Sequence, residues 1–135
     1  MIFAPKTTLL PVLALLAACQ PAAPPTAAPA NPARAAVLAA KTGLIERHDS
    51  LMTLAGRLQT LKEQLTPRPN AAPYLRGLTA ADQAMMTWMN RYAPDTTRPA
   101  AAQLAYLQAQ QAQLAAVETR MRSALDSARA FGGGQ

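Results

Sequence analysis

Leucine recurs at every seventh position through the middle of this chain, and two further leucines fill the intervening positions of the same repeat. A heptad repeat of apolar residues lines one seam of a helix, which a partner helix has to cover in a left-handed supercoil. The pattern predicts a helix over residues 34–65, which ends before Pro67 and Pro69 because proline cannot continue it. The repeat consists of Leu44, Leu51, Leu58 and Leu65, with Leu54 and Leu61 between them.

A second, shorter helix is expected over residues 79–92, after a connector of residues 66–77 that contains three prolines. Thr79 with Asp82 three residues later resembles a capping box, and this pair predicts where the helix begins. Pro94 follows its last turn, which is consistent with a helix that ends there.

A third helix is expected from Pro99, which suits a first-turn position, to Phe131, where a run of glycines ends it. Its apolar seam is thin, because alanine and glutamine are frequent in this segment. The two seam columns are Leu107, Leu114, Met121 and Ala128, and Leu104, Gln111, Glu118 and Leu125. No long stretch has the alternation of a strand, so the chain is predicted to be all-α. The fold class is an antiparallel three-helix bundle, coiled-coil-like, with two long helices and one short one.

The unequal helix lengths predict that one end of the bundle is underfilled. The first and third helices are each about 32 residues, or about 48 Å, and the second spans only about half of that length. The exposed end is then covered either by a connector or by a second molecule. The second of these alternatives implies a protein partner or self-association through the helix seams.

The amino-terminal segment has the features of a bacterial lipoprotein signal. Lys6 precedes an apolar stretch of about ten residues, which is too short to cross a bilayer and typical of a secretory signal. The stretch ends in Leu16, Ala17, Ala18 and Cys19, a string that resembles the bacterial lipobox. The resemblance implies cleavage between Ala18 and Cys19 and acylation of Cys19. Because this is the single cysteine of the chain, no internal disulfide is expected.

A proline- and alanine-rich tract over residues 20–33 predicts an extended stalk of about 40 Å at full stretch. Gln20 follows the cysteine where an aspartate would retain a lipoprotein at the inner membrane, so the expected location is the outer membrane, facing the periplasm. The lipid on Cys19 would attach the protein to the membrane without a spanning segment. The predicted division is a signal peptide (1–18), a lipidated cysteine and linker (19–33), a helical bundle (34–131) and a glycine-rich tail (132–135).

Composition limits the classes of function. Removal of the signal peptide with Lys6 leaves 12 basic and 7 acidic residues. Nucleic acid is not an expected partner, because an exported protein rarely meets it and the aromatic content of 4% is too low for base stacking. Lipid head groups, or an envelope polyanion bound through Arg120, Arg122 and Arg129, are candidate partners for this basic charge. Ordinary solvated helix faces are the alternative. No enzyme is expected, because the one histidine, His48, has no catalytic partners at suitable spacing.

One constellation suggests metal chemistry. His48 and Met52 are four residues apart and share a helix face, and Met85, Met86 and Met89 lie beside Trp88 in the second helix. Imidazole with thioethers is a ligand set that favours Cu(I), and Ag(I) by the same softness. An antiparallel pairing with Leu78 level with Lys62 would bring the two motifs into one layer. Packing of these residues in the core is one alternative explanation, and a partner-binding surface is the other.

The motifs HDSLM at 48–52 and AADQAMMTWM at 80–89, with Leu58, Leu61, Lys62 and Leu65 between them, resemble a group of small bacterial lipoproteins. Members of this group are often labelled as similar to viral A-type inclusion proteins. The resemblance covers about residues 44–128. This sequence departs from the pattern because the residue directly after Asp49 is not acidic and the residue directly after Met52 is not proline. The resemblance implies the location and the helical fold, and it leaves the function open.

Overall fold

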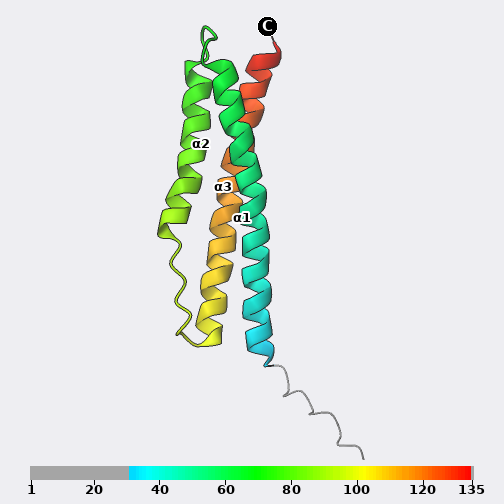
Figure 1. Cartoon of the computed structure of the whole chain (residues 1–135), viewed down its shortest axis with the longest axis vertical. Coiled ribbons are helices and arrows are strands. Elements are labelled where there is room, and N and C mark those ends of the chain that lie inside the picture. Colours follow the sequence, from blue (N-terminus) through cyan, green and yellow to red (C-terminus); the bar gives the residue numbers. More distant parts are fainter. Residues whose placement is uncertain (1–30, 135) are drawn as a thin grey trace, which may run out of the picture.

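The computed structural model describes residues 31–134, which form three helices and no strand. The helices are α1 (Pro32–Leu65), α2 (Ala72–Arg91) and α3 (Ala100–Gly133), and they pack side by side as a bundle (Figure 1). The all-α prediction of two long helices and one short one is confirmed. The proposed signal peptide, Cys19 and most of the linker lie outside the described residues. No helix in the described part is long and apolar enough to span a membrane.

Helices α1 and α3 run parallel, and α2 runs antiparallel to both (Figure 1). Two polar contacts join the parallel pair and report its register: Gln111 Nε2 donates to the carbonyl of Ala40 at 2.9 Å, and Arg47 pairs with Glu118 at 3.5 Å. Both contacts join residues that are 71 positions apart. This offset is close to ten heptads, so the leucine column of α1 runs level with the Leu107 column of α3.

The predicted seams form the core. Leu58 and Leu114 are each 0% exposed, and the whole of both columns is buried. The second column of α3 is only partly buried, and its Gln111 and Glu118 make the polar contacts to α1 instead of apolar ones. The core residues are Leu44, Leu51, Leu54, Leu58, Leu65, Ala71, Leu78, Ala81, Met85, Trp88, Leu107, Leu114, Met121, Leu125 and Ala128.

Helix α2 begins at Ala72, seven residues before the predicted start. The prediction was wrong because Pro73 was assigned to the connector, whereas it lies in the first turn of α2, where its missing N–H has no partner to lose. Thr79 is therefore inside the helix and does not cap it. Asp82 instead approaches Lys62 of α1, with 4.0 Å between Oδ2 and Nζ.

The ends of α1 and α3 also differ slightly from the prediction. Asn31 caps α1, because its Oδ1 accepts hydrogen bonds from the N–H groups of Ala33 (3.0 Å) and Arg34 (3.4 Å). Pro32 is the first helical residue, so the last two residues of the expected linker belong to α1. At the other end, α3 continues through the first two glycines of the expected tail.

The shortness of α2 leaves one end of the bundle to a loop. Helix α2 has 20 residues against 34 in each of the other two, or about 30 Å against about 51 Å. Residues 92–99 run from the end of α2 to the start of α3 along the uncovered end (Figure 1). The predicted underfilled end is therefore the one where α1 and α3 both begin, and this loop partly covers it.

Candidate functional site

The two motifs rich in histidine and methionine meet between α1 and α2. The rings of His48 and Trp88 have centroids 6.0 Å apart, and His48 and Tyr92 line one pocket, as the predicted register required. Lys62, which was expected to lie level with Leu78, has the Asp82 carboxylate, one turn further along α2, within 4.0 Å of its Nζ. Helices α1 and α2 each pack more extensively on α3 than on one another.

A small pocket of about 250 Å³ lies at this seam. It is lined by Leu44, Ile45 and His48 of α1 and by Trp88, Met89 and Tyr92 at the end of α2. The His48 side chain is partly exposed, and its Nδ1 lies 3.2 Å from Oδ1 of Asp49. The structure thus brings together one imidazole and one thioether of the five proposed ligands.

The other three methionines of the proposed metal site differ in their surroundings. Met85 is 1% exposed and belongs to the core. Met52 and Met86 are 44% and 45% exposed. Residues 31–134 contain no group of three or more His, Cys, Asp or Glu that could hold a metal ion. A metal at this seam would therefore depend on thioether sulfurs for most of its ligands.

Four aromatic rings form a row across the bundle. The row begins with His48 and Trp88. The ring centroids of Trp88 and Tyr92 are 5.2 Å apart, and those of Tyr92 and Tyr106 of α3 are 6.0 Å apart. The buried Nε1 of Trp88 has no hydrogen-bond partner among the described residues. Burial, together with the nearby Tyr106, raises the pKa of the Tyr92 hydroxyl above its ordinary value. The row ends at a second, larger cavity, which Tyr92 and Tyr106 also line.

This larger cavity, the end cavity, has a volume of about 740 Å³ and lies where α1 and α3 begin. Its apolar lining includes Val37 and Leu38 of α1 and Leu107 of α3, and loop 92–99 contributes residues to its wall. Leu38 is 66% exposed, the highest value among the large apolar side chains of the described part. The full lining is Asn31, Arg34, Ala35, Val37, Leu38, Lys41, Tyr92, Ala93, Pro94, Asp95, Thr96, Arg98, Ala100, Ala102, Gln103, Tyr106 and Leu107.

Side chains of α3 hold the loop that forms this wall. The Tyr106 hydroxyl accepts a hydrogen bond from the N–H of Ala93, and Gln103 Nε2 donates to the carbonyls of Thr96 (3.1 Å) and Arg98 (2.6 Å). The cavity is therefore bounded by a fixed loop. The residues that line this site were not predicted from the sequence. The sequence does predict a short second helix, and this implies an uncovered end of the bundle. It does not show which residues border that end.

The charged residues of the end cavity are mostly basic. Arg34, Lys41 and Arg98 line it, with Asp95 as the single acidic residue. Hydrogen bonds from the side chain and backbone of Thr97 lower the pKa of the Asp95 carboxyl, with a smaller contribution from Arg98. Asp95 is thus a carboxylate at neutral pH. Among residues 31–134, the ion pairs within 4.0 Å include none of the three basic side chains.

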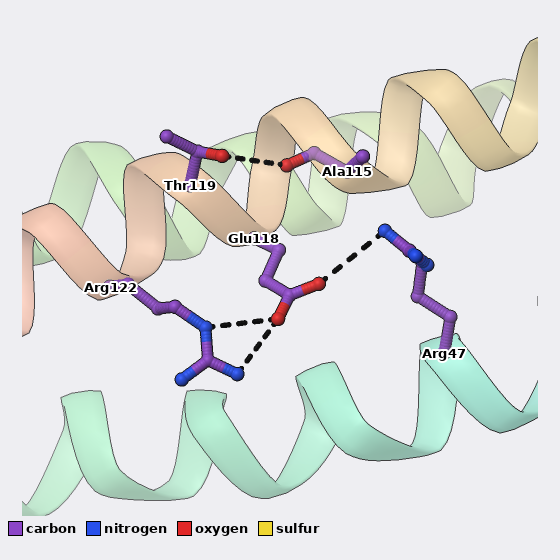
Figure 2. A network of polar contacts seen from close by, with 5 residues as sticks. All are labelled: Arg47, Ala115, Glu118, Thr119 and Arg122. Atoms are coloured by element: carbon purple, nitrogen blue, oxygen red, sulfur yellow. Dashed lines mark hydrogen bonds and ion pairs between the residues drawn. The ribbon is translucent and has the colours of Figure 1, made fainter.

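Two of the three arginines proposed for polyanion binding lie close to carboxylates of α3. Figure 2 shows Glu118 between Arg122 and Arg47, with Arg122 donating to its Oε1 from Nε (2.9 Å) and from a terminal nitrogen (2.8 Å). Arg129 lies 3.9 Å from Asp126. Arg120 instead borders shallow hollows between α2 and α3. Arg122 and Arg129 therefore each have a carboxylate beside them, and polyanion binding stays a prediction.

Comparison of the chain with protein-family models, with curated proteins and with solved structures found no match. The resemblance to the small lipoproteins therefore stays a prediction. The end cavity and the pocket at the α1–α2 seam are the two candidate sites in the described part of the chain.

Proposed function

We propose that this chain is a cell-envelope lipoprotein whose helical bundle is a non-enzymatic binding module for a small, largely apolar molecule. The observation that carries the proposal is the end cavity. Its volume of about 740 Å³ falls within the range of about 300–1,000 Å³ that small-molecule sites occupy. Its lining also combines apolar side chains with a few polar groups, which is typical of such sites.

The position of the cavity supports an action close to a membrane. Asn31 lines the cavity, and the chain before it leads back to the proposed lipid on Cys19. If the proline-rich tract is extended, it spans no more than about 40 Å. The mouth of the cavity would then lie within reach of the bilayer, where apolar small molecules are concentrated.

The anchor has its own test. Mass spectrometry of the native protein is expected to find acyl chains on an amino-terminal Cys19, and Cys19→Ser is expected to release the protein from membranes. An unmodified thiol or an intact leader would contradict the lipoprotein assignment. This result would leave the binding proposal open, because the two rest on different parts of the chain.

Binding is tested with the chain of residues 20–135, whose core lies wholly within residues 44–128. The purified chain is incubated with envelope extracts and purified again, and the small molecules that it retains are identified by native mass spectrometry. Ala102→Trp places an indole in the cavity wall, and Ala109→Trp is the matched control on the exposed surface of α3. Loss of the bound molecule only in Ala102→Trp is expected. Equal retention by both variants, at unchanged Tm, would place any ligand elsewhere.

Cu(I) or Ag(I) binding at the α1–α2 seam is a second candidate function. The observation that favours it is the pocket that His48 shares with Met89, with the exposed Met52 one turn further along α1. Titration with Cu(I) against a chelator is the test. His48→Ala and Met89→Leu are expected to weaken binding, whereas the core substitution Met85→Leu is the control. An affinity no tighter than micromolar, or no effect of Met89→Leu, would end this candidate.

A further inference from the structure

We infer that the end cavity takes a single-chain lipid with a phosphate head group. This inference rests on the proposed function, because it names the class of molecule that the same cavity would bind. It is carried by two features of the lining. One is an exposed apolar wall, and the other is a surplus of positive charge that the described residues leave without a partner.

The apolar wall suits an alkyl chain. Val37, Leu38 and Leu107 line the cavity together with the rings of Tyr92 and Tyr106. Leu38 remains 66% exposed despite its place on this wall. An alkyl chain laid against it would remove apolar surface from water on both sides of the contact, which favours binding.

The basic side chains flank this wall. Arg34, Leu38 and Lys41 follow one another at spacings of four and three residues, so they share one face of α1. Arg98 approaches the same cavity from the loop. An amphiphile with its chain on Leu38 would therefore have its head group within reach of cationic side chains.

The net charge selects the head group. Three basic residues and the ionised Asp95 give the cavity a formal charge of +2. A phosphate monoester carries a charge of about −1.5 to −2 at neutral pH and accepts charge-assisted hydrogen bonds from arginine. A carboxylate head would leave part of the positive charge without a partner, and a quaternary ammonium head would be repelled.

The same argument disfavours the chain's own lipid as the occupant. Acyl chains on Cys19 carry no anionic group, so they would cover the apolar wall and leave the formal charge of +2 unbalanced. A second copy of the chain would bring a surface that is itself basic, since residues 31–134 hold more lysine and arginine than aspartate and glutamate. A phosphate-headed single chain satisfies both the wall and the charges.

The test uses isothermal titration of delipidated residues 20–135 with dodecyl phosphate, dodecanoate and dodecyltrimethylammonium, each below its micelle concentration. We expect dodecyl phosphate to bind at least about tenfold more tightly than the ammonium probe, a difference of ~1.4 kcal/mol. The preference should shrink as salt is raised, because the basic side chains at the rim are screened.

Variants locate the effect in the cavity. Arg34→Gln and Arg98→Gln are each expected to weaken dodecyl phosphate binding by about tenfold, as for loss of a charge-assisted contact. Arg57→Gln is the matched control, because Arg57 is an exposed arginine of α1 that does not line the cavity. Leu38→Gln is expected to weaken all three probes alike, since it alters the wall for the alkyl chain.

The outcomes separate this inference from the proposed function. Equal affinity for the three head groups would overturn the inference and leave the cavity as an apolar binding site. An equal effect of Arg57→Gln and Arg34→Gln would overturn it too, because general surface charge would then explain the binding. If residues 31–135 bind every probe much more tightly than residues 20–135, the chain's own amino-terminal segment occupies the cavity. Absence of binding by any probe would contradict both proposals.

Discussion

The backbone N–H of Ala93 donates a hydrogen bond to the hydroxyl of Tyr106, with 2.8 Å between nitrogen and oxygen. This bond joins the first part of loop 92–99 to α3, and Gln103 holds the later part through two backbone carbonyls. Two side chains from one helix thus set the path of the loop. Since the loop is a wall of the end cavity, these two residues also set the shape of that cavity.

Replacing Tyr106 with phenylalanine removes the acceptor for Ala93 and keeps the ring. We expect the free energy of unfolding to fall by about 0.5–1.5 kcal/mol, the net value of one hydrogen bond. Hydrogen exchange at the Ala93 amide should become faster, and urea denaturation gives the stability. Tyr74→Phe is the control, because the Tyr74 ring stacks on Phe131 at 4.4 Å, away from the loop. Unchanged exchange at Ala93 would show that this bond does not hold the loop.

Two leucines of α1 should differ sharply in their contribution to stability. Leu58 is 0% exposed and Leu38 is 66% exposed. Leu58→Ala is expected to cost about 2–5 kcal/mol by leaving a cavity in the core. Leu38→Ala should change the free energy of unfolding by less than about 0.5 kcal/mol. Urea denaturation of the two variants measures both. A large loss at Leu38 would mean that another part of the chain covers it.

The raised pKa of Tyr92 predicts a loss of stability at alkaline pH. Because the folded state holds the phenol proton more tightly than the unfolded state, the contribution of this group to stability is complete below the ordinary phenol pKa of 10.0 and is lost as pH rises through the raised pKa of the folded state. The free energy of unfolding of Tyr92→Phe should therefore decline less steeply above that pH. Phenolate absorbance follows the titration directly. The same slope in Tyr92→Phe and in the wild-type protein would contradict the assignment.

The ion pairs around Glu118 should contribute little. Glu118 Oε2 lies 3.5 Å from Arg47, and the Glu118 and Arg47 side chains are 27% and 41% exposed. We expect Glu118→Gln to lower the free energy of unfolding by less than about 1 kcal/mol, as for other solvent-accessible pairs. The loss should shrink in high salt. Glu46→Gln, at an exposed position of α1, is the comparison. A loss several times larger would mean that this network fixes the α1–α3 register by itself.

The helical core was predictable because its signal is local and repeated. The leucine column from Leu44 to Leu65 specifies a buried seam by spacing alone, and the structure buries every member of it. The start of α2 was not predictable in the same way. Proline both breaks helices and begins them, and the sequence around Pro73 does not separate these roles. Thr79 and Asp82 had the spacing of a cap but lie inside the helix.

The two candidate sites also differ in how far they could be predicted from the sequence. The meeting of HDSLM with MMTWM followed from the antiparallel register of two neighbouring helices, which the short connection enforces. The end cavity depends on the path of loop 92–99, which Gln103 and Tyr106 determine from the following helix. No periodic pattern encodes such a path. The sequence could therefore predict an uncovered end, but it could not predict that Arg34 and Arg98 would border one cavity there.

The parallel arrangement of α1 and α3 has an electrical consequence. Each helix carries the equivalent of about half a positive charge at its amino-terminal end, and both of these ends lie beside the end cavity. Helix α2 points the other way, but it stops short and ends in the basic Arg91. The bundle is thus a dipole whose positive pole is at Asn31. In the field of an anionic bilayer surface, that pole would turn toward the lipid head groups and present the mouth of the cavity to them.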